Sequence, residues 1–95
     1  DIEVVVRRQA GQCAERLVDR GLYARSVQLK LRSGGFSTLT RSRTLPGFTR
    51  AEEPIADAAL TMAREWARYQ SRVGVRLIGV GVSGLEASPD PGQLL

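Results

Sequence analysis

Arginine dominates the chemistry that this sequence could perform. All but one of its 14 basic residues are arginine, whose planar guanidinium group forms paired hydrogen bonds to phosphate oxygens. Codon bias in a GC-rich genome would favour arginine as well. The chain contains no histidine, so the commonest general base and the Ser/His and Cys/His nucleophile pairs are missing. We therefore expect anion binding and no complete enzyme active site in this chain.

The remaining reactive residue types offer no catalytic or metal site. Cys13 is the only cysteine, which excludes an intramolecular disulfide and a cysteine-based zinc cage. It lies on the apolar side of a predicted helix, where a buried, inert thiol is the usual outcome. Glu52 and Glu53 resemble charges at a helix N-terminus rather than metal ligands. We assign no catalytic and no metal-binding residue.

The basic residues are concentrated where acidic residues are absent. No acid lies between Asp19 and Glu52. That window contains seven cations: Arg20, Arg25, Lys30, Arg32, Arg41, Arg43 and Arg50. Codon bias does not explain the missing acids, and an uncompensated group of cations indicates a polyanionic partner.

Two segments have the periodicity of amphipathic helices. Residues 2–20 place an apolar face on one side, and Gly21 is a suitable left-handed stop. The expected face consists of Ile2, Val5, Val6, Cys13, Leu17 and Val18. Thr49 and Glu52 resemble the capping box of a second helix, but Pro54 is tolerated only near a first turn, so the helix should begin nearer Glu53 than Arg50. It should run to about residue 72. Its core-facing stripe is Ile55, Ala59, Met62, Trp66 and Tyr69, in which Trp66 fits a core position better than a base-stacking one.

Three segments alternate as strands do. Residues 25–32 point apolar side chains one way and polar ones the other. A turn at residues 33–35 leads into a second strand over 36–45, which Pro46 and Gly47 should end. Residues 75–83 form the third strand. The order α-β-β-α-β predicts an α+β, two-layer sandwich, with two helices on one face of an antiparallel sheet. No apolar stretch approaches the roughly 18 residues that a membrane-spanning helix needs.

The other face of this sheet should meet solvent. It would present Ser26, Gln28, Lys30 and Arg32, and we expect Arg41 and Arg43 to point the same way because arginine is seldom buried unpaired. Cations and hydroxyls with almost no aromatic rings suit phosphate contact rather than base stacking. A merely solvated face, or one that binds an acidic protein in a regulatory domain, is the alternative.

The strand sequences RSVQLKLR (25–32), LTRSRTL (39–45) and VRLIGV (75–80) resemble a known family. They are similar, in order and spacing, to the C-terminal "little finger" domain of Y-family translesion DNA polymerases, in particular the bacterial DinB type. The resemblance implies a non-catalytic, cytoplasmic DNA-binding domain, which grips primer-template duplex while a separate Mg²⁺-dependent polymerase domain performs nucleotidyl transfer. By motif position, the implied phosphate contacts are Lys30, Arg32, Arg41, Ser42, Arg43 and Arg76, beside Ser26 and Gln28 on the same face.

The two ends of the chain depart from the family pattern. Domains of this βαββαβ type begin with a strand that pairs with the last one, and here the first element is already a helix. We therefore expect an open edge on residues 75–83 and self-association through it. The domain should occupy 1–85 and a flexible tail 86–95. Gln93, Leu94 and Leu95 resemble the start of a sliding-clamp-binding peptide, cut short before its phenylalanine.

Overall fold

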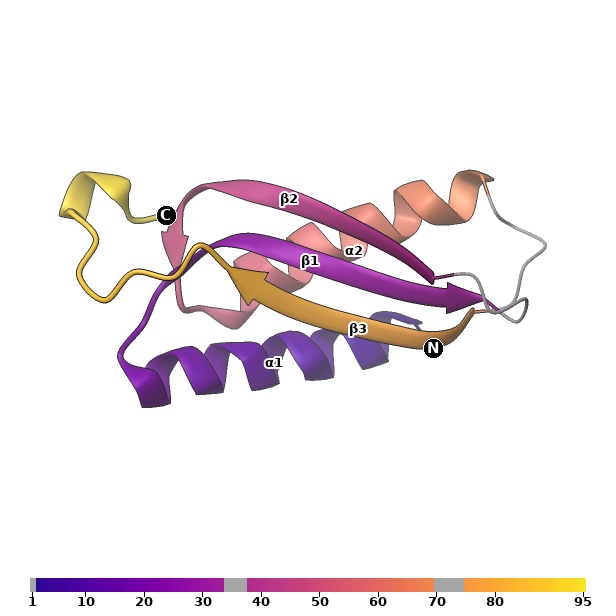
Figure 1. Cartoon of the computed structure of the whole chain (residues 1–95), viewed down its shortest axis with the longest axis horizontal. Helices are drawn as coiled ribbons and strands as arrows, with labels where there is room; N and C mark the ends of the chain where they lie inside the picture. The colour runs from indigo at the N-terminus through magenta and orange to yellow at the C-terminus, as the bar shows by residue number, and fades with distance from the viewer. Residues whose placement is uncertain (1, 34–37, 70–74) are drawn as a thin grey trace.

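The computed structural model describes residues 2–33, 38–69 and 75–95. It contains a three-stranded antiparallel sheet with two helices on one of its faces (Figure 1), which confirms the predicted two-layer α+β fold. The elements are α1 (Ile2–Arg20), β1 (Ala24–Ser33), β2 (Thr38–Thr49), α2 (Glu52–Tyr69), β3 (Val75–Ser83) and a short 3₁₀ helix, η1 (Pro91–Gln93). The predicted turn at 33–35 and the last predicted turn of the second helix extend beyond the described residues. Within residues 2–33, 38–69 and 75–95, no helix combines the length and the apolar character needed to cross a membrane.

Helix α1 packs on the sheet with a narrower apolar face than the sequence predicted. Its buried residues are Val6, Ala10, Cys13, Ala14 and Leu17. Ile2 and Val18, which we expected on this face, are 37% and 53% exposed. Spacings of three and four residues keep one face inward, and Val18, one position after Leu17, is rotated away from it.

Gly21 ends α1 as predicted. Its φ of 66° lies in the left-handed region, which side chains with a Cβ avoid. The backbone N–H of Leu22 donates to Leu17 O at 2.8 Å, and that of Gly21 donates to Val18 O at 3.1 Å. This pair of hydrogen bonds is a Schellman motif, and it turns the chain from the helix layer into β1.

Strand β1 is the centre of the sheet, whose order is β2-β1-β3 (Figure 1). Val27, Leu29 and Leu31 are buried beneath the helices, as the alternation predicted. In α2, Ile55, Ala59 and Met62 are also buried, and Trp66 packs against this core while remaining partly exposed. The side chain of Tyr69 lies outside the described residues. Because the apolar side chains of β1 point inward, its polar ones point to the face without helices.

Strand β2 does not end at Pro46, contrary to our prediction, but continues to Thr49. Its pairing with β1 is regular up to Thr44 opposite Ser26, and an irregularity then leads to Thr49 opposite Ala24. Proline is tolerated there because β2 is an edge strand and the ladder is interrupted. The predicted capping box is also wrong: α2 begins at Glu52, and the Thr49 hydroxyl accepts a hydrogen bond from the backbone N–H of Ala51 at 3.0 Å.

Side chains of α1 bind the outer edge of β3 at one residue. The backbone N–H of Val80 donates to Gln9 Oε1 at 2.8 Å, and the Cys13 thiol donates to Val80 O at 3.4 Å. These contacts replace the two hydrogen bonds that a neighbouring strand would make. The expectation of an open edge is therefore wrong at Val80. The predicted burial of Cys13 is confirmed, since only 4% of the residue is exposed.

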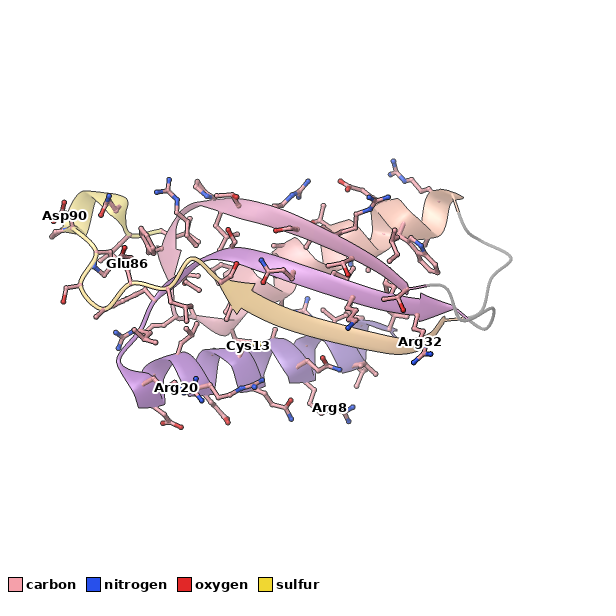
Figure 2. The ribbon with its side chains drawn as sticks, in the orientation of Figure 1. Arg8, Cys13, Arg20, Arg32, Glu86 and Asp90 are labelled. Atoms are coloured by element: carbon pink, nitrogen blue, oxygen red, sulfur yellow. The ribbon has the colours of Figure 1, made fainter. Side chains whose placement is uncertain are left out.

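Residues 86–95, for which we predicted a flexible tail, contact the domain at two places. Glu86 and Tyr23 exchange backbone hydrogen bonds of 2.8 and 2.9 Å, and the backbone N–H of Leu95 donates to Phe48 O at 2.8 Å. Figure 2 shows Glu86 and Asp90 in this segment, at the end of the sheet opposite Arg32. The chain end thereby lies beside the irregular end of β2.

Candidate nucleic-acid interface

The sheet face that the helices leave uncovered carries only polar and small residues among those whose side chains the structure describes. We call it the open face. It consists of Ser26, Gln28, Lys30 and Arg32 on β1, their partners Thr44, Ser42, Thr40 and Thr38 on β2, and Ser83, Gly81 and Gly79 on β3. Residues directly opposite each other in an antiparallel pair point to the same side of the sheet. None of these residues is acidic, so Lys30 and Arg32 give the set a net positive charge.

A hydrogen-bonded row crosses the middle of the open face. The side-chain amide of Gln28 donates to Ser83 Oγ at 2.7 Å and to Ser42 Oγ at 3.3 Å. Ser26 and Thr44 form a second, longer contact of 3.5 Å between their hydroxyls. The row links all three strands and holds these side chains in place. Hydroxyl groups so arranged can donate to phosphate oxygens.

Two glycines of β3 leave the backbone bare beside Lys30 and Gln28 of β1. Gly79 lies opposite Lys30, and Gly81 lies opposite Gln28. A Cβ added at Gly79 would meet Lys30 Cβ at 3.6 Å, and one added at Gly81 would meet Gln28 Oε1 at 3.9 Å, which are ordinary contacts. Packing within the described part of the domain thus does not require glycine at either position. A smooth backbone surface permits close approach by a large ligand.

Arg41 and Arg43 do not belong to the open face, contrary to our prediction. They lie opposite Leu29 and Val27, whose side chains point toward the helices. Both arginines are nevertheless exposed, because β2 is the edge of the sheet and long side chains can reach solvent past it. We expected exposure to mean the outward face, but at an edge strand either parity can be exposed. The predicted phosphate-binding set is therefore divided between two surfaces.

The second surface is a groove between β2 and α2. Its volume is about 290 Å³, and it is lined by Arg41, Ser42, Arg43, Met62, Glu65 and Trp66. Arg43 Nη2 lies 3.4 Å from Glu65 Oε1, with both side chains about half exposed. We call this feature the β2–α2 groove. Sequence reasoning missed Glu65 as part of the site, because its proximity to Arg43 depends on how α2 crosses β2.

Two cations of the acid-free window are used in packing. The Arg50 guanidinium lies 3.8 Å from the centre of the Tyr23 ring, and its Nε is buried. Arg25 lies 5.5 Å from the centre of the Phe48 ring and donates to Leu45 O at 3.4 Å. Cation–π contacts of this kind stabilise the corner between β1 and β2. These contacts make the two arginines less available to a ligand.

The remaining predicted site residues have different positions. Arg76 lies on β3, where the pairing register shifts between Arg32 and Ser33, and its side chain is outside the described residues. Gln93, Leu94 and Leu95 are close to Gly47 and Phe48 at the end of β2. Sequence reasoning also omitted Thr40, Thr44 and Ser83 from the site. The alternation of hydroxyl residues along β2 was the available signal for the two threonines.

The described residues form a two-layer α+β domain whose open sheet face is basic and rich in hydroxyl groups. The sequence model described as the impB/mucB/samB family C-terminal domain matches residues 1–94, and the chain belongs to this family. The resemblance to the C-terminal domain of Y-family DNA polymerases is thereby confirmed.

Relatives with known names are similar over most of this chain. It is 46% identical over 84 residues to a DNA polymerase IV of Streptomyces coelicolor, covering 88% of the chain and 17% of that protein. It is 40% identical over 86 residues to a DNA polymerase IV of Corynebacterium diphtheriae, and the match covers 90% of the chain and 18% of that protein. A DNA polymerase IV of Methanoculleus marisnigri is 44% identical over 77 residues, and the match covers 81% of the chain and 21% of that protein. The chain thus spans only about a fifth of the length of these relatives.

Proposed function

We propose that the open face binds the phosphate backbones of duplex DNA, as the primer-template-binding domain of a Y-family translesion polymerase. The observation that carries this proposal is the acid-free open face, in which Lys30 and Arg32 extend a row of hydroxyl and amide groups across three strands. Phosphate contacts of this kind hold DNA without reading its sequence. The named relatives, all DNA polymerases, support the same assignment.

The spacing of the open face suits a repeating polyanion. Residues two apart on a strand lie roughly 6.6 Å apart, about twice the 3.4 Å rise between nucleotides of one DNA strand. Lys30 and Arg32 can therefore contact different phosphates. Binding should be insensitive to base sequence and should weaken steeply with salt, because each neutralised phosphate releases condensed counterions.

In the complete protein, the reaction would be template-directed nucleotidyl transfer by a separate polymerase domain that uses Mg²⁺. We assign no residue of this chain to that metal and none to the chemical step. The role of this domain would be to hold primer-template DNA in the cytoplasm while the lesion is bypassed. Electrostatic contact through a sheet face is sufficient for that role, because no reacting atom has to be positioned by the domain itself.

A salt-titrated binding experiment tests the proposal. Fluorescence anisotropy with a labelled duplex would compare the chain with a Lys30→Ala/Arg32→Ala variant and with Arg8→Ala, which removes a cation from α1 on the side away from the sheet (Figure 2). The double variant should bind more weakly, with a log–log salt slope reduced by about 2, since each contact contributes about 0.9. The Arg8 variant should leave the slope almost unchanged.

Two outcomes of that experiment would contradict DNA binding by the open face. One is an unchanged affinity and slope in the Lys30/Arg32 variant. The other is no salt-dependent duplex binding by the unmodified chain, combined with binding of an acidic peptide that depends on Lys30 and Arg32. The second result would identify the alternative, a regulatory or protein-interaction domain with an acidic partner.

The chain end carries a separate proposal. We propose that Gln93, Leu94 and Leu95 belong to a peptide that binds the sliding clamp of the replication machinery. In the structure, the backbone N–H of Leu95 donates to Phe48 O at 2.8 Å, so clamp binding in an extended form would first require release from β2. Surface plasmon resonance on immobilised clamp tests this, and equal responses with and without residues 93–95 would exclude the peptide.

The edge of β3 carries another proposal, which concerns self-association. We propose that two copies of the chain pair through this edge at high concentration, which requires Gln9 and Cys13 to release Val80. Edge strands without a complete set of partners favour such pairing. Light scattering across a concentration series tests it, and a monomer throughout the series would overturn it.

A further inference from the structure

The β2–α2 groove combines cations with an aromatic ring on a surface separate from the open face. We propose that it binds one unpaired nucleotide of DNA, with the base against the indole of Trp66 and the phosphate at Arg41 and Arg43. This inference rests on the proposed DNA-binding function. It adds a second site, with a different form of DNA as its ligand.

The position of Trp66 supports a base-stacking role. The side chain packs against the core, yet the residue stays partly exposed and lines the groove. Because the core already holds the ring on one side, little conformational entropy of the side chain is lost when a ligand stacks on its free surface. Aromatic side chains in single-strand binders stack on bases in this way. Within a duplex both faces of a base are covered by its neighbours, so the ligand has to be unpaired.

The two arginines supply the phosphate-binding part. Within the part of the chain that the structure describes, Arg41 has no ion-pair partner, whereas Arg43 lies 3.4 Å from Glu65. Glu65 therefore orients Arg43 and neutralises part of its charge, which leaves Arg41 as the stronger anion-binding group. A planar guanidinium group can bind two phosphate oxygens at once.

The dimensions and location of the groove limit what it can hold. Its volume of about 290 Å³ is just below the range for small-molecule sites, roughly 300–1,000 Å³, so it suits a single base rather than a longer ligand. Ser42 lines the groove and also accepts a hydrogen bond from Gln28 in the row of the open face. The two surfaces therefore adjoin at β2, and a strand leaving a duplex on the open face can enter the groove.

Trp66 is the only tryptophan of the chain, so its fluorescence reports on the groove directly. We would titrate the chain with an oligothymidylate of about 8 nucleotides, within the site sizes of roughly 4–16 nucleotides known for single-strand-binding domains. The comparison ligands are a duplex and an abasic oligonucleotide of the same length. The oligothymidylate should quench Trp66, and the abasic strand should bind roughly 5- to 150-fold more weakly, as the loss of one stacked base predicts.

Variants separate the groove from the open face. Arg41→Ala should weaken oligothymidylate binding several-fold, as measured by anisotropy, whereas Arg64→Ala should not, because Arg64 lies on the same helix as Trp66 but pairs with Glu3 of α1. Trp66→Phe, which keeps a ring, should bind the strand more tightly than Trp66→Leu, which removes it. Equal affinities of these two tryptophan variants for the strand would overturn the stacking role.

The two proposals fail in different ways. If duplex binding depends on Lys30 and Arg32 but the oligothymidylate leaves Trp66 fluorescence unchanged, the groove proposal is wrong and the duplex proposal stands. If Trp66 is quenched and Arg41 is required while Lys30 and Arg32 have no effect on duplex binding, the groove proposal stands alone. Equal affinity for the abasic and the complete strand would also reject the groove as a base-binding site.

Discussion

Arg41 lies directly opposite Leu29 in the antiparallel register of β2 and β1, although Leu29 is fully buried and Arg41 is exposed. The two side chains point to the same side of the sheet. Leu29 lies on the central strand beneath the helices, whereas Arg41 lies on the edge strand, from which a long side chain reaches water. This relationship divides the basic residues between the open face and the β2–α2 groove.

The contact between Arg43 and Glu65 predicts that removing the acid strengthens DNA binding. Glu65→Gln should raise affinity for the oligothymidylate roughly 1.4- to 5-fold at low salt, because the half-exposed ion pair that competes with phosphate is worth about 0.2–1 kcal/mol. Anisotropy titrations measure this change. Glu15→Gln makes the same charge change on α1 and is the matched control; an equal gain in both variants would mean that net charge alone is responsible.

The contacts of Gly47 predict that a single methyl group releases the chain end. A Cβ at this position would lie 2.8 Å from both Gln93 O and Leu95 N. In Gly47→Ala the tail should detach while the domain stays folded, since the atoms in conflict belong to the last three residues. Hydrogen exchange of the Leu95 amide should become fast, and the proposed clamp binding by residues 93–95 should become stronger.

Gly92→Ala is the control for that prediction. Within the described residues nothing lies within 4 Å of a Cβ added there, although the position is in the same tail. Its Leu95 amide should exchange as slowly as that of the unmodified chain. Slow exchange in Gly47→Ala as well would contradict the docking of the tail on β2.

The hydrogen bond from Val80 to Gln9 predicts a stability effect. In Gln9→Ala the backbone N–H of Val80 would lose its 2.8 Å partner, and a buried unsatisfied donor costs about 1–3 kcal/mol of the free energy of unfolding. Urea denaturation measures this loss. Gln12→Ala, one turn along α1 on its exposed side, should change the free energy of unfolding by less than about 0.5 kcal/mol. Similar losses in the two variants would show that Gln9 has no special role at the β3 edge.

The buried thiol predicts a loss of stability in alkaline solution. Burial raises the pKa of Cys13 above its ordinary value of 9.0, and the nearby Arg16 offsets this only in part. The unfolded thiol therefore ionises at lower pH than the folded one. The stability that the neutral thiol contributes is complete below the unfolded pKa and is lost as pH rises toward and through the folded pKa.

The measurement is the free energy of unfolding as a function of pH, compared between the chain and Cys13→Ala. The difference between the two curves should be constant near neutral pH and should shrink above about pH 9, by at most about 1.4 kcal/mol per pH unit. Parallel curves up to about pH 10.5 would contradict a raised thiol pKa, because a thiol near its ordinary value ionises alike in both states.

Local patterns in the sequence determined the elements and the inner surface of the central strand. The alternation of Val27, Leu29 and Leu31 predicted the buried face of β1 because one side of that strand is covered along its length. The end of α1 at Gly21 was also predictable from local sequence, since glycine has no Cβ and adopts the left-handed conformation readily. The acid-free cluster of cations likewise indicated a polyanionic partner, because charge depends on composition and not on folding.

Tertiary structure decided how those cations are distributed. The face of Arg41 and Arg43 depends on the register of β2 against β1. Leu39 and Leu45 share the parity of the two arginines, so this side of the strand mixes apolar and charged residues and its alternation alone did not decide which way the arginines point. The use of Arg50 in packing depends on Tyr23, 27 positions earlier in the chain. Strand pairing and helix packing join residues that are distant in sequence, so only the folded chain brings Trp66 and Arg41 into one groove.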